Sequence, residues 1–170
     1  MLEPHALLNS LAPSAAASAL RRCCGAERWV AAMLKERPFA STEQLLRLAE
    51  WLWKGLSSED YLEAFSHHPQ LGNDGSTDGQ HLEHTRDLSQ QEQATLASAK
   101  QPTLLRLEAG NRAYRERFGF IFIACATGKT AEEVLELLTA RLDHEPAREL
   151  SVAAAEQAKI TRLRLLGLGA

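Results

Sequence analysis

One histidine in this chain lies where a proton-transfer group could be held firmly. His68 begins the string His-Pro-Gln-Leu-Gly at residues 68–72, which follows a helical pattern over residues 58–65. Pro69 biases the histidine away from helical geometry, so the pattern predicts an imidazole at the end of a helix. Histidine has an ordinary pKa that lets it both give and take a proton near neutrality. We therefore consider His68 a candidate acid–base residue.

A second candidate set lies in the string Ser-Gln-Gln-Glu-Gln at residues 89–93. Ser89 with Glu92 three residues later forms a capping-box pattern, which could serve any helical protein. Glu92 is also four residues from both Leu88 and Leu96, so a helix would place its carboxylate on the apolar face. Because a carboxylate there is costly without a partner, we expect it to meet a polar group or to line a pocket.

The helical pattern near the C-terminus supplies a cation. Arg164 follows Ile160 by four residues and so shares its inward face, whereas Arg162 points almost the opposite way. One interpretation is an arginine that covers the edge of the core. The other is a fixed cation over an anionic substrate, for which the rigid guanidinium fork is well suited.

Two further patterns look like functional sites and are set aside. Gly128-Lys129-Thr130 ends like a phosphate-binding P-loop, but that motif needs a glycine where this chain has Ile123. The histidines between residues 67 and 84 suggest a metal site, yet they match neither HExxH nor a cysteine-rich pattern. Surface histidines are the simpler interpretation, so we expect no metal site here.

The apolar pattern that must position these residues is helical almost throughout. Capping signatures at Ser41 and Thr130 each precede a helical stripe, and residues 146–166 have proline at the start and glycine after the end. Helices are also expected over residues 13–36, 90–100 and 102–117.

Two segments break this helical pattern. Residues 71–81 are polar and glycine-rich, as in a surface loop. Residues 118–127 are apolar with aromatic and β-branched side chains, which single-sequence rules assign to a buried strand. Since one strand without a partner cannot form a sheet, we expect an extended buried connection within an all-α fold.

Length and composition limit the class of protein. A chain of 170 residues is most simply one domain, residues 1–170, with a substantial core. The net charge of −3 gives no basic surface for nucleic acid or an acidic membrane. Three cysteines, two of them adjacent, fit a reducing compartment better than a disulfide framework. No apolar stretch approaches the length of a membrane span. We expect a compact single-domain helical bundle of about eight helices.

Six motifs occur in a fixed order along almost the whole chain, from about residue 5 to residue 166. They are His68-Pro-Gln-Leu-Gly72, Ser89-x-x-Glu92-Gln93, Asn111-x-x-Tyr114-x-x-x-Phe118-Gly-Phe-x-Phe122, Gly128-Lys-Thr, Arg141-Leu and Ile160-x-x-Leu-Arg164-Leu. In this order and spacing they closely resemble the 2-oxo-4-hydroxy-4-carboxy-5-ureidoimidazoline decarboxylase family. The chain departs from the family pattern near His144, where asparagine is usual, and in the composition of residues 73–81.

The resemblance implies a cofactor-independent carboxy-lyase that forms (S)-allantoin in the third step of urate degradation. The substrate ring can accept the electron pair that carbon dioxide leaves behind, so neither pyridoxal, thiamine nor a metal is required. By analogy with the family, His68 donates the proton. Glu92 hydrogen-bonds the ring hydroxyl and raises the protonated fraction of the imidazole.

The resemblance also implies the remaining contacts with a small-molecule substrate. Ser89 and Gln93 would contact its ureido or ring carbonyl groups, and Pro69 would form part of the wall. Arg164 would hold a substrate carbonyl or carboxylate. The backbone of Phe120, Ile121, Phe122 and Ile123 would offer N–H and C=O groups to the ureido end, because an extended segment does not use them internally.

Family members are usually homodimers, so we expect this chain to pair with a second copy, without nucleic-acid or membrane partners. The C-terminal Gly-Leu-Gly-Ala carries no peroxisomal address, which favours a cytoplasmic setting. Two other functions remain open. One is a non-catalytic helical interaction module that uses residues 118–127 to contact a partner. The other is a metal-dependent hydrolase that uses the histidines of residues 67–84 and loses activity with a chelator.

Overall fold

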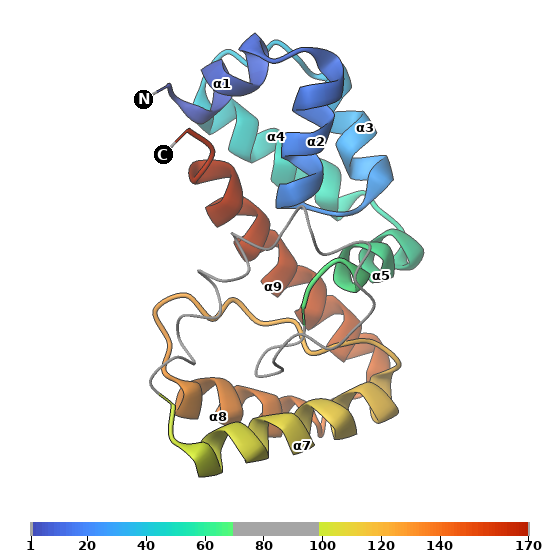
Figure 1. Ribbon diagram of the computed structural model, residues 1–170. Coiled ribbons are helices and arrows are strands. Elements are labelled where there is room, and N and C mark those ends of the chain that lie inside the picture. Colours follow the sequence, from blue (N-terminus) through green and yellow to red (C-terminus); the bar gives the residue numbers. More distant parts are fainter. Residues whose placement is uncertain (1, 70–98, 170) are drawn as a thin grey trace. The chain divides into compact units, whose positions relative to one another are not determined.

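The regular structure of this protein is helical (Figure 1). The computed structural model describes residues 2–69 and 99–169, and every regular element within these ranges is an α-helix. The predicted all-α fold is therefore confirmed. Close contacts divide the chain into a first unit, Met1–Ala64 with Ala158–Ala170, and a second unit, Phe65–Gln157. The single domain over residues 1–170 stays a prediction.

The first unit is built from helices that pack on their neighbours in sequence. It contains α1 (Pro4–Ser10), α2 (Pro13–Cys23), α3 (Glu27–Lys35), α4 (Thr42–Lys54), most of α5 (Ser58–Ser66) and the end of α9 (Pro146–Leu166). Helix α2 packs on α1 and α3, and α4 also contacts both of these helices. As predicted, the Ser41 side chain caps α4 by accepting a hydrogen bond from the backbone N–H of Gln44.

Residues 13–36, for which the sequence predicts one helix, instead form α2 and α3. Cys24 is extended, with φ −150° and ψ 122°, and Gly25 follows it. Glycine in a helix interior costs about 1 kcal/mol relative to alanine, which favours a break here. The break also lets the apolar sides of α2 and α3 pack on each other, which one continuous helix could not do.

The second unit contains two long helices that run in the same direction. These are α7 (Gln101–Phe118) and α8 (Ala131–Arg141), which pack side by side (Figure 1). At their starts, Thr103 Oγ1 donates to Glu132 Oε1 over 3.2 Å. At their other ends, Arg117 in the last turn of α7 donates through Nη2 to the backbone oxygen of His144, beyond α8, over 3.1 Å. The chain must therefore return along the length of α7 before α8 can begin.

This return explains why residues 119–130 are not helical. An 18-residue helix such as α7 is about 27 Å long, and twelve more helical residues would span only about 18 Å. Twelve extended residues can reach about 40 Å. The structure confirms the predicted non-helical connection, and residues 122–126 are all buried. We call residues 119–130 the crossover.

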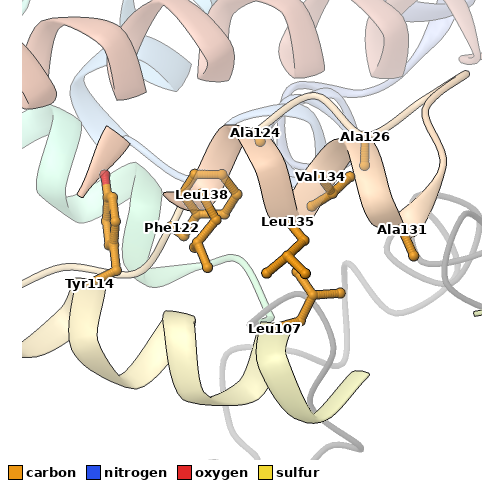
Figure 2. Packing of buried hydrophobic residues seen from close by; sticks show 9 residues of the cluster. All are labelled: Leu107, Tyr114, Phe122, Ala124, Ala126, Ala131, Val134, Leu135 and Leu138. Carbon is orange, nitrogen blue, oxygen red and sulfur yellow. The ribbon is translucent and has the colours of Figure 1, made fainter. Parts of the chain in front are cut away.

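The core of the second unit lies between α7, α8 and the crossover. Figure 2 shows Phe122, Ala124 and Ala126 from the crossover against Leu107 and Tyr114 of α7, with the side chains of α8 beside them. At its start α8 has a complete capping box, in which Thr130 and Glu133 each cap the other's backbone N–H, as the sequence predicts. None of the described helices combines the length and the apolar character needed to cross a membrane.

Candidate functional site

His68 lies just beyond the end of α5, as the sequence predicts. Its backbone N–H donates to the carbonyl of Phe65 over 3.1 Å, and its side chain is half-buried. The ring of Phe65 is buried and packs on Phe120 of the crossover, with 5.4 Å between the ring centroids. These contacts place His68 and the half-buried Pro69 close to the start of the crossover.

The imidazole of His68 is held by a residue that the sequence analysis did not single out. His68 Nε2 lies 2.6 Å from Oε1 of Gln157, whose side chain is completely buried on α9. Gln157 lies three residues before Ile160 and so shares the inward face of its helix. A glutamine among apolar inward positions was the available signal, because a buried amide needs a hydrogen-bond partner.

The crossover contributes backbone groups that side chains already contact. The carbonyl of Ile123 accepts a hydrogen bond from Arg141 Nη1 over 2.7 Å. The N–H of Cys125 donates to Glu156 Oε2 over 2.8 Å. A carbonyl oxygen has two lone pairs, so the bond from Arg141 leaves Ile123 able to accept another hydrogen bond.

The aromatic side chains of the crossover face the core of the second unit. The ring of Tyr114 lies 5.7 Å from that of Phe120 and 5.3 Å from that of Phe122, both edge-on. Ile121 is half-buried, and Phe122 and Ile123 are buried. The side chains of these residues thus pack in the core of the second unit, and the contact of their backbone groups with a substrate stays a prediction.

A buried ionic cluster supports the crossover from behind. Glu149 is fully buried and accepts hydrogen bonds from Arg141 Nε, over 2.7 Å, and from the Tyr114 hydroxyl. Its other oxygen lies 2.7 Å from Nδ1 of His144. The guanidinium of Arg141 also lies over the Phe122 ring, 4.6 Å from its centroid. Burial and the bond to Glu149 both raise the pKa of Tyr114, which keeps its hydroxyl protonated.

Sequence reasoning missed Glu149 because a glutamate in the first turn of a helix, as here in α9, is ordinary. Its burial depends on Arg141 and His144, which belong to α8 and the turn that follows it. His144, near which the sequence departs from the pattern of the family it resembles, therefore belongs to this cluster.

Arg164 belongs to the first unit and faces inward, as its spacing predicts. Its exposed fraction is 5%, equal to that of Ile160, whereas Arg162 is exposed. Arg164 Nη1 donates to the backbone oxygen of Arg22 near the end of α2, over 3.2 Å. This contact fits an arginine at the edge of the core, and its predicted role toward a substrate stays a prediction.

Arg164 lies near two buried thiols in the same unit. Burial raises the pKa of Cys23 and of Cys24 to about 12, and the positive charge of Arg164 partly opposes this effect. Both cysteines are therefore neutral thiols near neutral pH, in agreement with an apolar packing role.

Ser89, Glu92 and Gln93 lie outside the described residues, as do the loop 71–81 and most of the predicted helix 90–100. The expected meeting of Glu92 with His68 thus stays a prediction. Within residues 2–69 and 99–169, no group of three or more His, Cys, Asp or Glu side chains is arranged to hold a metal ion. Among the residues that the structure describes, the candidate chemical group is His68, whose imidazole is held at Nε2 in an arrangement suited to proton transfer.

A family model described as OHCU decarboxylase matches residues 9–166. The uric acid degradation bifunctional protein TTL of Arabidopsis thaliana is 38% identical over 146 residues, which are 86% of this chain. The chain spans only 45% of the length of that relative. The 2-oxo-4-hydroxy-4-carboxy-5-ureidoimidazoline decarboxylase of Haloferax volcanii is 32% identical over 143 residues, covering 81% of this chain and 79% of its own.

A crystal structure of OHCU decarboxylase in the presence of (S)-allantoin has a similar fold. Its TM-score against this chain is 0.76 at 35% sequence identity. The similarity covers 89% of this chain and 96% of that one.

Proposed function

Because this chain belongs to the OHCU decarboxylase family, we propose that it decarboxylates 2-oxo-4-hydroxy-4-carboxy-5-ureidoimidazoline (OHCU) to (S)-allantoin. This reaction is the third step of urate degradation and needs no added cofactor. The observation that carries the proposal is the half-buried imidazole of His68, which lies just beyond α5 and is held by Gln157 of α9. The chain around it matches the family over residues 9–166.

The proposed chemistry requires one proton donor and an ordered substrate. The bond between the ring carbon and the carboxylate breaks, and its electron pair enters the conjugated ring as carbon dioxide leaves. His68 then transfers a proton to that carbon from one side, which sets the S configuration, and the imidazole regains a proton from solvent. The protein must hold the carboxylate out of the ring plane and exclude the opposite approach.

The other site residues have supporting roles in this proposal. Glu92 hydrogen-bonds the ring hydroxyl and favours the charged imidazole, while Ser89 and Gln93 contact carbonyl groups of the substrate. Pro69 and the backbone of residues 120–123 form the wall against the ureido end. Arg164 holds a carbonyl or carboxylate oxygen.

The test uses the optical purity of allantoin made from urate by the two upstream enzymes. We expect the intermediate to decay unaided to racemic product, so the protein should add optical rotation. His68→Asn should abolish this rotation while the helical circular dichroism is unchanged. His67→Asn is the matched control and should keep full activity. Normal stereospecific turnover by His68→Asn would remove this histidine from the mechanism.

We also propose that the chain forms a homodimer, as the resemblance to its family implies, and that it acts in the cytoplasm. Light scattering coupled to size-exclusion chromatography measures the mass directly, and a mass of about 19 kDa rather than twice that value would contradict pairing.

A further inference from the structure

We propose that Gln157 is a positioning residue of the proton-transfer site. Its amide oxygen holds the Nε2–H of His68, so that the proton exchanged with the substrate is the one on Nδ1. This inference rests on the proposed function of His68. It adds a residue that lies 89 positions away in sequence and on a different helix.

The geometry gives Gln157 a fixed position and His68 a dependent one. Gln157 lies within the 21-residue helix α9, where backbone hydrogen bonds hold the chain on both sides, and its side chain is completely buried. His68 comes two residues after the last residue of α5 and lies outside any helix, with its backbone N–H bonded to the carbonyl of Phe65. A bond of 2.6 Å between the two side chains therefore fixes the rotation of the imidazole more than that of the amide.

The chemistry of the amide oxygen decides which ring nitrogen carries the hydrogen. A carbonyl oxygen can only accept, so Nε2 of His68 must donate. Nε2 then keeps its hydrogen in both the neutral and the charged imidazole. The site that gains and loses a proton is consequently Nδ1, on the opposite side of the ring.

Burial makes this bond costly to remove. Burying an amide oxygen in a protein interior without a hydrogen-bond partner costs about 1–3 kcal/mol of stability. A neutral acceptor also leaves the charge of the site unchanged, whereas a glutamate at this position would form an ion pair with the charged imidazole. A glutamine thus orients His68 without holding its proton strongly.

The first experiment is spectroscopic and needs no substrate. Nitrogen-15-edited NMR of the full chain should show a slowly exchanging Nε2–H resonance, which His68→Asn identifies among the six histidines. Gln157→Met has a similar volume but no acceptor, so this resonance should be lost. Gln157→Glu restores an acceptor oxygen and should restore it. A wild-type His68 protonated at Nδ1 in its neutral form, or a resonance that persists in Gln157→Met, would overturn the proposal.

The second experiment measures stereospecific turnover in the same variants. Gln157→Met should lower kcat by about ten- to a hundredfold with little change in KM, because a misplaced acid still permits substrate binding. Ser151→Ala changes an exposed position on the same helix and should have no effect.

If wild-type protein shows the resonance but no turnover, the proposed function fails and the hydrogen bond stands. If turnover survives the loss of the resonance, Gln157 does not position the acid. Should Gln157→Met fail to fold, the wild-type and Gln157→Glu spectra still decide the matter.

Discussion

The two units of this chain bury polar groups in different ways. Among the described residues of the first unit, the buried polar side chains are Thr161 and Arg164, both on α9. The second unit buries the ion pair of Arg141 and Glu149, and Arg141 also donates to the carbonyl of Ile123 in the crossover.

The difference follows from the course of the backbone. A helix satisfies its own N–H and C=O groups, so a core made of helices needs few buried polar side chains. The crossover passes through the core without forming a helix. Its backbone N–H and C=O groups must therefore be paired by side chains such as Arg141 and Glu156. Buried charge in the second unit is thus a consequence of parallel helices and the long return between them.

Removing the negative member of the cluster should have the largest effect on stability. Glu149→Gln leaves the buried guanidinium of Arg141 without a counter-charge and should lower the free energy of unfolding by about 3–5 kcal/mol. Urea denaturation followed by circular dichroism measures this change. Glu50→Gln in the first unit breaks an exposed pair with Lys54 and should cause no measurable loss. Equal effects of the two changes would remove the distinction between the units.

A double variant sharpens the same comparison. Buried ion pairs can often be replaced by apolar side chains without loss of stability. Arg141→Met with Glu149→Leu should nevertheless remain destabilised, because the Ile123 carbonyl and the Tyr114 hydroxyl lose their partners. Wild-type stability of the double variant would show that the crossover does not need the cluster.

Glycines in the two units should respond oppositely to alanine. A Cβ at Gly110 of α7 would lie 2.1 Å from Cδ2 of Leu138, so Gly110→Ala should lose about 1–3 kcal/mol despite the better helix propensity. At Gly55, after α4, the nearest atom would be 3.6 Å away and φ is −87°. Gly55→Ala should therefore gain about 0.4–1 kcal/mol. Thermal unfolding measures both, and a stabilising Gly110→Ala would contradict the close packing of α7 on α8.

Local patterns predicted most helices but not the contacts between them. Residues 146–166 form α9 with the expected bounds, since proline and glycine mark its ends. The capping pattern at Thr130 likewise gave the start of α8. The short helix α1 was not anticipated, and the break at Gly25 within the predicted helix 13–36 was missed because its advantage lies in packing α2 on α3.

The same limit applies to the site. The position of His68 followed from Pro69 and the helix before it, and the inward face of Arg164 followed from helical spacing. Gln157 and Glu149 escaped prediction because each gains its importance from a partner on another segment. Spacing within one helix shows which residues face inward, but it cannot show what they meet there.

The smallest expected effect on stability comes from the neutral thiols of the first unit. Well below pH 9, Cys23 and Cys24 are protonated in both the folded and the unfolded chain, so their contribution is fully present. Because burial raises both folded pKa values from 9.0 to about 12, the unfolded chain loses these protons first as pH rises. The free energy of unfolding should thus fall by roughly half a kcal/mol per thiol at pH 9, and further toward pH 12. Urea titrations from pH 7 to 9 measure the loss.

Thiol labelling extends this prediction to both units. Iodoacetamide at pH 8 should leave Cys23 and Cys24 unmodified in native protein and modify them in urea, with mass spectrometry locating the label. Cys125 in the crossover is also buried and provides the matched probe of the second unit. Labelling under native conditions requires local opening, so its rate compares the stability of the two units directly. Faster labelling of Cys23 and Cys24 than of Cys125 would mean that the helices of the first unit open more readily than the crossover with its buried ion pair.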